Sequence, residues 1–276
     1  MPEGGSRRAR SAPYPSIFAV LRYLTLPEAQ TFAFSVSTMA VLAFFPFMIV
    51  LLMVIRRVIE SSAMNDVLTQ ILRDHLPIGQ DFVIHALNGL VNARKQVEYG
   101  SMLLLFLTAR LVFMPLEVAL NHIWKFDKTR SWLHNQFVGI GLILLCGVLA
   151  LFSVAFTAGN EYLLDAALGG KHNPTARLFA FLVMKFIATA ASITIFFLIY
   201  WLVPNGPVSP RRVFPVALIF GLLWELMKYA YIMLLPNLNF QVVYGPFATS
   251  VALIFWGYIS GLILLAGAFA SARNRS

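Results

Sequence analysis

The stretch VFPVALIFGLLWELMKYAYIMLL, residues 213–235, has the length and apolar character of a helix that crosses a lipid bilayer. Such a helix needs roughly 20 mostly apolar residues, because each residue adds about 1.5 Å and the hydrocarbon core is about 30 Å thick. Five other stretches meet the same test. The six expected spans are residues 31–55, 99–124, 137–158, 176–203, 213–235 and 246–270.

The composition agrees with a membrane protein. Hydrophobic residues make up 59% of the 276 residues and charged residues only 12%, which is too little polar surface to cover a soluble globule. The first 30 residues lack the pattern of a removable signal peptide, so we expect the first apolar segment to stay in the protein. The single cysteine, Cys146, excludes an intrachain disulfide and a multi-cysteine metal site. We expect an all-α, polytopic integral membrane protein.

The distribution of basic residues predicts the orientation, since Lys and Arg favour cytoplasmic loops. Of the 21 Lys and Arg residues, 11 lie in the two tails and the second and fourth connections, and seven lie in the first and third connections. Three acidic residues lie in the tails and the second and fourth connections, and seven lie in the first and third connections. We therefore predict cytoplasmic tails at 1–30 and 271–276 around one membrane domain at 31–270. Only Arg56 and Arg57, at the outer end of the first span, oppose this orientation.

The longest connection, residues 56–98, is expected to be an extracytoplasmic loop with two short amphipathic helices. Apolar residues recur at helical spacing around 67–72 and again around 83–90, with a Leu-Pro-Ile-Gly turn at 76–79 between them. Asp74, His75, Asp81 and His85 also lie here, but their spacing is not that of a metal site. We expect no metal and no other cofactor.

Residues 200–270 resemble the YihY/BrkB family of bacterial inner-membrane proteins. The shared pattern is a Tyr-x-x-x-Pro-Asn helix end, a basic turn, a Trp-Glu pair, a Tyr-Gly pair, and a Trp followed by Gly-Ala. In this chain it is carried by Tyr200, Pro204, Asn205, Arg211, Arg212, Trp224, Glu225, Tyr244, Gly245, Trp256, Gly267 and Ala268. The segments ALNHIW at 119–124 and AFFPF at 43–47 resemble other parts of the family pattern. One departure is Phe269, where the family usually has an acidic residue.

The resemblance implies a six-helix inner-membrane protein associated with envelope integrity or, in some pathogens, with resistance to host serum. The family has also carried a ribonuclease label, but metal-assisted phosphodiester hydrolysis needs clustered carboxylate or His ligands that water can reach. The expected cytoplasmic face has only Glu3, Glu28 and Asp127 as carboxylates. We therefore expect no ribonuclease activity, no catalytic residues and no nucleic-acid partner.

Five ionisable residues lie inside the expected spans: Arg110, Glu117, Lys185, Glu225 and Lys228. A charge at a helix centre costs about 2.5–3.5 kcal/mol on insertion scales, so these side chains should face protein, water or each other. Arg110 and Glu225 fall at similar depth and are candidate partners. Glu225 and Lys228 are spaced i,i+3 on one helix and can touch.

Two interpretations of these charges remain open. In the first they are ion pairs that only set the order and rotation of the helices. In the second they line a polar cavity between the second, fourth and fifth spans that binds an anionic solute or lipid headgroup, with Asn121 and Tyr244 as accessory hydrogen-bonding groups. For Asn121, a structural role as a polar cap where helices pack is as good an interpretation as a role in binding.

The functional hypothesis is a transporter or lipid-handling protein of the envelope, with membrane lipids and an anionic solute or headgroup as partners. The alternative is a non-transporting structural protein that maintains the envelope through lipid or protein contacts. The oligomeric state does not follow from the sequence. Gly257 and Gly261 form a Gly-x-x-x-Gly pattern, for which we expect close helix contact within the bundle rather than a dimer face.

The orientation is tested by a reporter fused after Ser276. Because the basic residues place both tails in the cytoplasm, an enzyme active only in the cytoplasm should be active in this fusion. A matched reporter inserted in the loop at 56–98 should give the opposite result. Activity of a reporter that works only outside the cytoplasm, when fused at Ser276, would overturn the topology.

Overall fold

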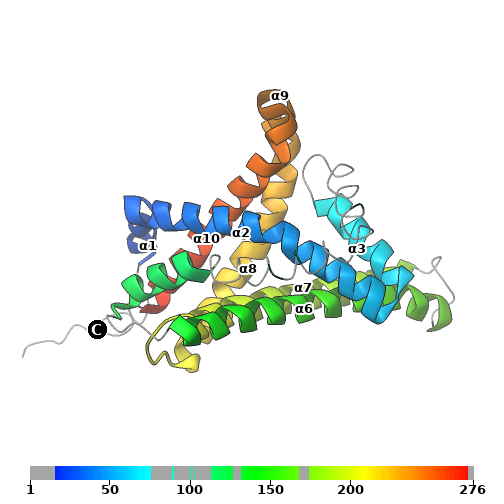
Figure 1. The fold of residues 1–276 in the computed structure, drawn as a ribbon, viewed down its shortest axis with the longest axis horizontal. Helices are drawn as coiled ribbons and strands as arrows, with labels where there is room; N and C mark the ends of the chain where they lie inside the picture. Colours follow the sequence, from blue (N-terminus) through cyan, green and yellow to red (C-terminus); the bar gives the residue numbers. More distant parts are fainter. Residues whose placement is uncertain are drawn as a thin grey trace, which may run out of the picture.

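The computed structural model is helical and describes residues 16–75, 113–126, 132–167 and 174–272, with the single residues 89, 100 and 103. Figure 1 shows the arrangement of its helices. They are α1 (Ile17–Leu24), α2 (Pro27–Val54), α3 (Ser62–His75), α6 (Trp132–Ala167), α7 (Pro174–Leu202), α8 (Pro210–Leu234), α9 (Phe240–Tyr244) and α10 (Ala248–Ala272). A π-helical segment, Ile55–Ile59, extends α2, and residues 113–124 are also helical.

Five helical stretches in the described residues are long and apolar enough to cross a membrane. They are Pro27–Ile59, Leu133–Thr157, Lys185–Leu202, Pro210–Leu238 and Phe240–Ala272. These stretches coincide with five of the six expected spans, so the prediction of an all-helical, polytopic membrane protein is confirmed. The remaining expected span, 99–124, is described continuously only from residue 113, and most of its first half lies outside the described residues.

Two helix boundaries differ from those expected. The helix α6 continues to Ala167, beyond the expected end at 158, because the segment 161–167 contains Glu, Leu and Ala, which favour helix even where the chain is polar. The expected N-terminal tail contains the helix α1. Its first turn is capped by Ser16, whose Oγ accepts a hydrogen bond from the N–H of Ala19 at 3.4 Å.

The first of the two amphipathic helices expected in the 56–98 connection is confirmed as α3. Its residues Met64, Leu68 and Leu72 are buried against α2 and against Val154 of α6. Arg56 Nε donates a hydrogen bond to Asn65 Oδ1 at 2.6 Å, so this basic residue ties the end of the first span to α3. The second expected helix, the turn at 76–79, Asp81 and His85 lie outside the described residues. Across the described part of the chain, no group of three or more His, Cys, Asp or Glu residues could hold a metal ion.

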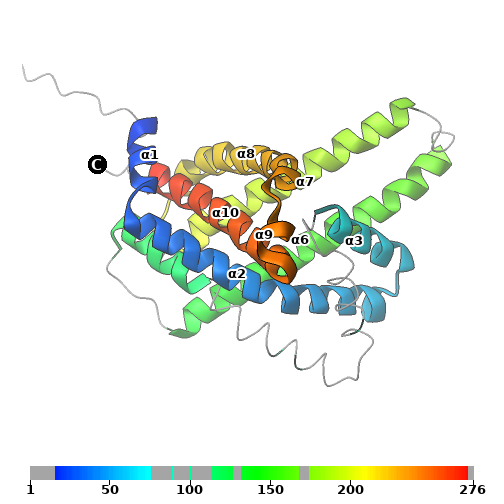
Figure 2. The ribbon, with the colours of Figure 1, turned by 90° about the horizontal axis from the view of Figure 1, so that it is seen from above.

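Among the described helices, the most extensive contact joins α2 and α10, which run side by side in Figure 2. A Cβ atom at Gly261 would lie 3.1 Å from the Cα and carbonyl oxygen of Ala33, and one at Gly257 would lie 2.6 Å from Ser37 Oγ. Ser37 Oγ also donates a hydrogen bond to the carbonyl of Ile254 at 2.6 Å. The Gly-x-x-x-Gly pattern therefore packs inside the molecule, as expected, and allows two backbones to approach closely.

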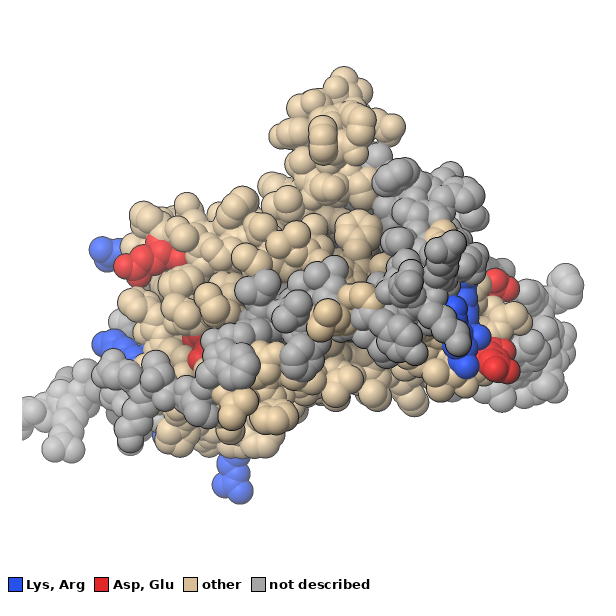
Figure 3. Space-filling view, in the orientation of Figure 1, with Lys and Arg blue, Asp and Glu red and all other residues tan. Residues whose placement is uncertain are grey.

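Charged side chains gather toward the two ends of the face shown in Figure 3. Most Lys, Arg, Asp and Glu side chains drawn in colour there lie toward the left and right, and the described residues between them are mostly uncharged. Large apolar side chains are exposed along the spanning helices, among them Phe186 and Met233. Exposed apolar residues in this number are expected where a helix faces lipid instead of water.

The contact between α2 and α10 can be tested by placing alanine at Gly261. The added Cβ would press on the backbone of Ala33, so Gly261→Ala should lower the free energy of unfolding by about 1–3 kcal/mol, as is usual for overpacking. A lower midpoint of thermal unfolding in detergent would show this. The matched control is Gly141→Ala in α6, where a Cβ meets nothing within 4 Å and should leave the midpoint unchanged or higher. Equal midpoints for the two variants would contradict the contact.

Candidate functional site

Two lysines and one glutamate come together where α7 packs on α8. Lys228 Nζ lies 2.7 Å from Glu225 Oε2, the i,i+3 contact that the sequence suggests. The other carboxylate oxygen of Glu225 accepts a hydrogen bond from Ser192 Oγ of α7 at 2.6 Å. Lys185 Nζ lies 3.6 Å from the centre of the Tyr229 ring, and Lys228 Nζ lies 5.3 Å from the same ring. These five residues, Lys185, Ser192, Glu225, Lys228 and Tyr229, are called the charge cluster below.

The charge cluster is buried on one side and accessible on the other. Glu225 is only 6% exposed, whereas Lys185 and Lys228 are partly exposed and Tyr229 is 38% exposed. An aromatic ring face attracts cations, which helps to hold both ammonium groups beside Tyr229. The described residues of the cluster carry two positive charges and one negative charge. The positive side of the cluster is therefore the side that a molecule in the membrane can reach.

A second polar group connects three segments of the chain and is called the polar junction. Glu117 Oε1 accepts hydrogen bonds from the side-chain amides of Asn135 at 2.6 Å and Asn205 at 2.9 Å. Asn121 Oδ1 accepts one from the backbone N–H of Asn205 at 2.7 Å. These bonds join the helical residues 113–124, the start of α6 and the turn after α7. The carboxylate and both amides thus hold helix ends together.

The turn that carries Asn205 is packed tightly. Val203 and Pro204, just before it, are buried, and a Cβ atom at Gly206 would overlap the ring of Phe126. Phe126 in turn stacks on Trp124, with the ring centres 6.1 Å apart. The Pro-Asn-Gly sequence therefore fits a turn in which only glycine leaves room for an aromatic ring.

The structure separates the residues that the sequence grouped. Glu117 and Asn121 belong to the polar junction, and Lys185, Glu225 and Lys228 to the charge cluster. Arg110 lies outside the described residues, so its pairing with Glu225 stays a prediction. Tyr244 lies in the short helix α9, exposed, with its ring 6.0 Å from that of Phe240, and the described contacts do not connect it to the charge cluster.

Four residues of these two groups were not predicted as site residues. Ser192 and Asn135 stand alone in apolar or ordinary helical sequence, and their partners lie on other helices, so spacing along the chain gives no signal. Tyr229 follows Lys228 in the chain, but its closer partner, Lys185, lies on α7. Asn205 does carry a signal, because it belongs to the Tyr-x-x-x-Pro-Asn pattern at the end of the fourth expected span. Its side chain bonds Glu117, 88 positions away in the chain.

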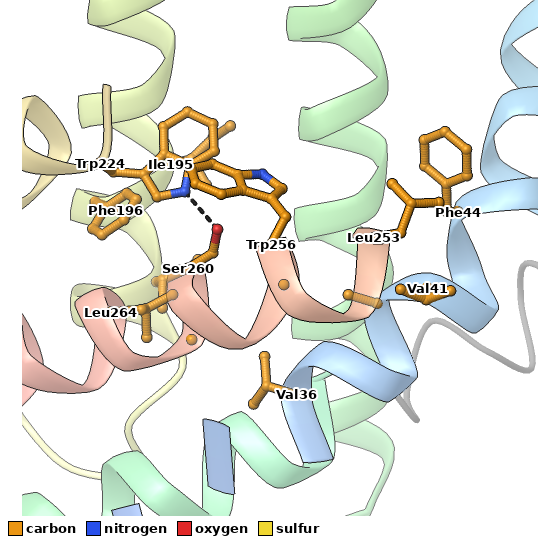
Figure 4. Close-up of a pocket in the computed structure, with 14 residues that line it drawn as sticks. Val36, Val41, Phe44, Ile195, Phe196, Trp224, Leu253, Trp256, Ser260 and Leu264 are labelled. Atoms are coloured by element: carbon orange, nitrogen blue, oxygen red, sulfur yellow. Dashed lines mark hydrogen bonds between the residues drawn. The ribbon is translucent and has the colours of Figure 1, made fainter. Parts of the chain in front are cut away.

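An apolar cavity of about 320 Å³ lies between α2, α7, α8 and α10. Figure 4 shows Trp224 and Trp256 on one side of it and Val36 and Val41 of α2 on the other. Trp224 Nε1 donates a hydrogen bond to Ser260 Oγ at 2.9 Å, drawn as the dashed line in Figure 4. A second apolar cavity of about 230 Å³ shares the walls Ala40 and Phe44 and is also lined by Cys146.

The start of the chain packs on the end of α10. Tyr23 of α1 stacks on Phe269, with ring centres 4.5 Å apart, so the residue that replaces the family's usual acid has an aromatic partner. Burial, and next the negative charge of Glu28, raise the pKa of Tyr23 to about 12, so its phenol stays neutral at physiological pH. Glu28 Oε2 also lies 3.2 Å from His122 Nε2, and both of these side chains are exposed.

Comparison with known proteins supports the resemblance found in the sequence. Residues 21–275 match the family described as virulence factor BrkB, which is nearly the whole chain. The chain belongs to the YihY/BrkB family. Among curated members of this family, a UPF0761 membrane protein of Idiomarina loihiensis is 32% identical over 200 residues, covering 70% of this chain and 66% of that protein.

Two further relatives match over 71% and 91% of this chain. A UPF0761 membrane protein of Pseudomonas paraeruginosa is 26% identical over 259 residues, covering 91% of this chain and 60% of the relative. One of Glaesserella parasuis is 28% identical over 199 residues, covering 71% of this chain and 68% of the relative. The chain thus spans about 60% to two thirds of the length of these YihY/BrkB relatives. No solved structure matches it.

The hydrogen bonds of the polar junction predict that Glu117 stabilises the folded protein. Replacing it by leucine leaves the amides of Asn135 and Asn205 without their acceptor, which should lower the free energy of unfolding by about 1–3 kcal/mol. Glu117→Gln keeps one acceptor oxygen and should cost less. Thermal unfolding in detergent measures both. Val118→Leu, on the exposed side of the same turn, is the matched control and should have no effect.

If Glu117→Leu instead unfolds at the same temperature as the parent protein, the carboxylate does not hold the helix ends together. Retained stability combined with lost function would then place Glu117 in a binding site.

Proposed function

We propose that this YihY/BrkB protein binds an anionic ligand, either a lipid headgroup or a free anionic solute, at the charge cluster, and that it transports or handles this ligand within the bacterial inner membrane. In this proposal the protein has six spans with cytoplasmic termini, supports envelope integrity and carries out no chemical step. The observation that carries the proposal is the presence of two ammonium groups around one carboxylate inside apolar helices.

The electrostatics support this reading. A cation in the hydrocarbon region costs about 2.5–3.5 kcal/mol on insertion scales unless it is compensated. Glu225 and the ring of Tyr229 compensate part of the charge of the two lysines. A phosphate or carboxylate that approaches the exposed side would make charge-assisted hydrogen bonds to both ammonium groups, each contributing about 1.5–3 kcal/mol. The partial exposure of Lys185, Lys228 and Tyr229 leaves a path for such a group along the helix surface.

One observation favours the alternative, a structural protein without transport. Both carboxylate oxygens of Glu225 are already engaged, one with Ser192 of α7 and one with Lys228 of α8. In the alternative, these contacts have a single role, which is to set the rotation of α7 against α8. In that case the two lysines should matter for folding but not for the binding of anions.

Binding of anionic probes separates the two functions. The protein, purified in a neutral detergent, is titrated with phosphatidylglycerol, with glycerol phosphate and with zwitterionic phosphatidylcholine. We expect at least one of the two anionic probes to bind more tightly than phosphatidylcholine. The double variant Lys185→Gln with Lys228→Gln should weaken anion binding by at least tenfold, because about 1.4 kcal/mol corresponds to tenfold in affinity.

Two further variants act as controls. Lys185→Arg with Lys228→Arg keeps both charges and should retain anion binding. Arg211→Gln with Arg212→Gln removes the same number of charges at exposed positions outside the cluster and should leave binding unchanged. If the glutamine variant at 185 and 228 folds and binds the anions as the parent does, the charge cluster is structural and the transport proposal fails.

A further inference from the structure

The apolar cavity of about 320 Å³ is lined on one side by α10. Its wall on that helix runs from Leu253 to Leu264, three turns of helix. At about 1.5 Å per residue this wall is about 16 Å long. An apolar wall of this length can contact a large part of one acyl chain, because each leaflet makes up about half of the roughly 30 Å hydrocarbon core.

The lining of this cavity suits hydrocarbon and not a polar solute. The polar side-chain groups among its lining residues are the indole N–H groups of Trp224 and Trp256 and the hydroxyl of Ser260. The indole N–H of Trp224 donates to Ser260 Oγ at 2.9 Å. The remaining walls are aliphatic, aromatic or glycine, including Val36, Phe44 and Ile195. A polar molecule placed here would lose its hydrogen bonds to water without replacement. A hydrocarbon chain loses nothing of this kind.

The cavity lies next to the charge cluster. Trp224 forms part of the cavity wall, and Lys228 Nζ lies 5.3 Å from the centre of the Trp224 ring. The two residues are four apart in α8 and so lie on the same face of that helix, one turn from each other. Glu225, the partner of Lys228, is the residue after Trp224. An anionic group at the lysines would therefore stand at one edge of an apolar groove.

We propose that the cavity holds one acyl chain of an anionic phospholipid whose headgroup lies at the charge cluster. This inference rests on the proposed function and narrows its ligand from any anion to a lipid. The headgroup interacts with Lys185 and Lys228, and the chain passes Trp224 and lies along α10 against the lining residues of α2 and α7. The chain keeps apolar surroundings there, because most of the lining residues are aliphatic or aromatic.

A lipid with a photoactivatable diazirine in one acyl chain tests the position of the chain. Phosphatidylglycerol that carries this group in the distal half of the chain is mixed with the full-length protein in neutral detergent and irradiated. Mass spectrometry should locate the crosslinks on the cavity-lining segments of α2 and α10. Crosslinks found mainly on exposed apolar positions outside the cavity, such as Leu226 and Met233, would overturn the proposal.

Filling the cavity should displace the chain. Ala40→Phe introduces a ring at a position that lines both apolar cavities, and it should reduce crosslinking to α10 by about tenfold or more. The matched control is Leu42→Phe, which adds a ring on the exposed side of the same helix and should leave crosslinking unchanged. If Ala40→Phe does not fold, Leu253→Trp fills the cavity from the opposite wall. Parental crosslinking in a folded, cavity-filled variant would contradict the proposal.

Glycerol phosphate distinguishes a failure of this inference from a failure of the proposed function. It has an anionic phosphate but no acyl chain, so Ala40→Phe should not change its binding, whereas the glutamine variant at Lys185 and Lys228 should weaken any binding that occurs. If anions bind through the lysines but Ala40→Phe leaves phosphatidylglycerol binding intact, the proposed function holds and the acyl-chain site does not. If no anion depends on the lysines, both proposals fail.

Discussion

A polar group in hydrocarbon must find a partner within the protein, and this constraint accounts for most of the specific contacts in the structure. Each unsatisfied group costs several kcal/mol in the bilayer core, where no water is available. Glu225 bonds Ser192 and Lys228, Tyr200 donates its hydroxyl to the carbonyl of Leu264, and Trp224 donates to Ser260. These contacts connect α7, α8 and α10. Because each contact specifies a direction, together they fix the rotation of the helices, which apolar packing alone leaves variable.

Small residues satisfy a different requirement. Apolar side chains gain little by leaving lipid for protein, so close approach and dispersion must hold the helices together. Gly257, Gly261 and Ala33 allow α2 and α10 to approach at the level of their backbones. Residues of this same pair of helices, Gly257 and Gly261 among them, also line the apolar cavity. The pair therefore provides both a close backbone contact and part of the wall of the space that we assign to an acyl chain.

The two polar groups have different roles in this interpretation. The polar junction contains one carboxylate with two amide donors, and its bonds link three segments of the chain. The charge cluster contains more positive than negative charge among its described residues and is accessible along the helix surface. Amides that donate to a carboxylate across three segments are typical of structural support, whereas accessible charge beside an apolar groove is typical of a site for an amphiphile. A phospholipid has both features, a charged headgroup and an apolar chain, in one molecule.

The spans at 31–55, 137–158, 176–203, 213–235 and 246–270 could be predicted because hydrophobic length is a local property of the chain. The contact of Glu225 with Lys228 could also be predicted, since i,i+3 spacing places both on one helix face. The helix α1 was missed because its eight residues are too short for a span, and the extension of α6 because the segment EYLLDAA is not apolar enough. The partners Ser192 and Asn135 were missed because they come from other helices than the carboxylates they bond. Tyr229 was missed because its close contact, with Lys185, joins two helices.

The sequence by itself determined that the chain is a helical membrane protein of the YihY/BrkB family with charges inside its spans, because length, composition and motif order are written along the chain. Only the tertiary structure decided that Glu117 and Glu225 belong to separate polar groups and that an apolar cavity adjoins one of them. The physical reason is that these arrangements depend on the relative rotation of helices. That rotation is set by contacts between residues far apart in sequence, and no local pattern encodes it.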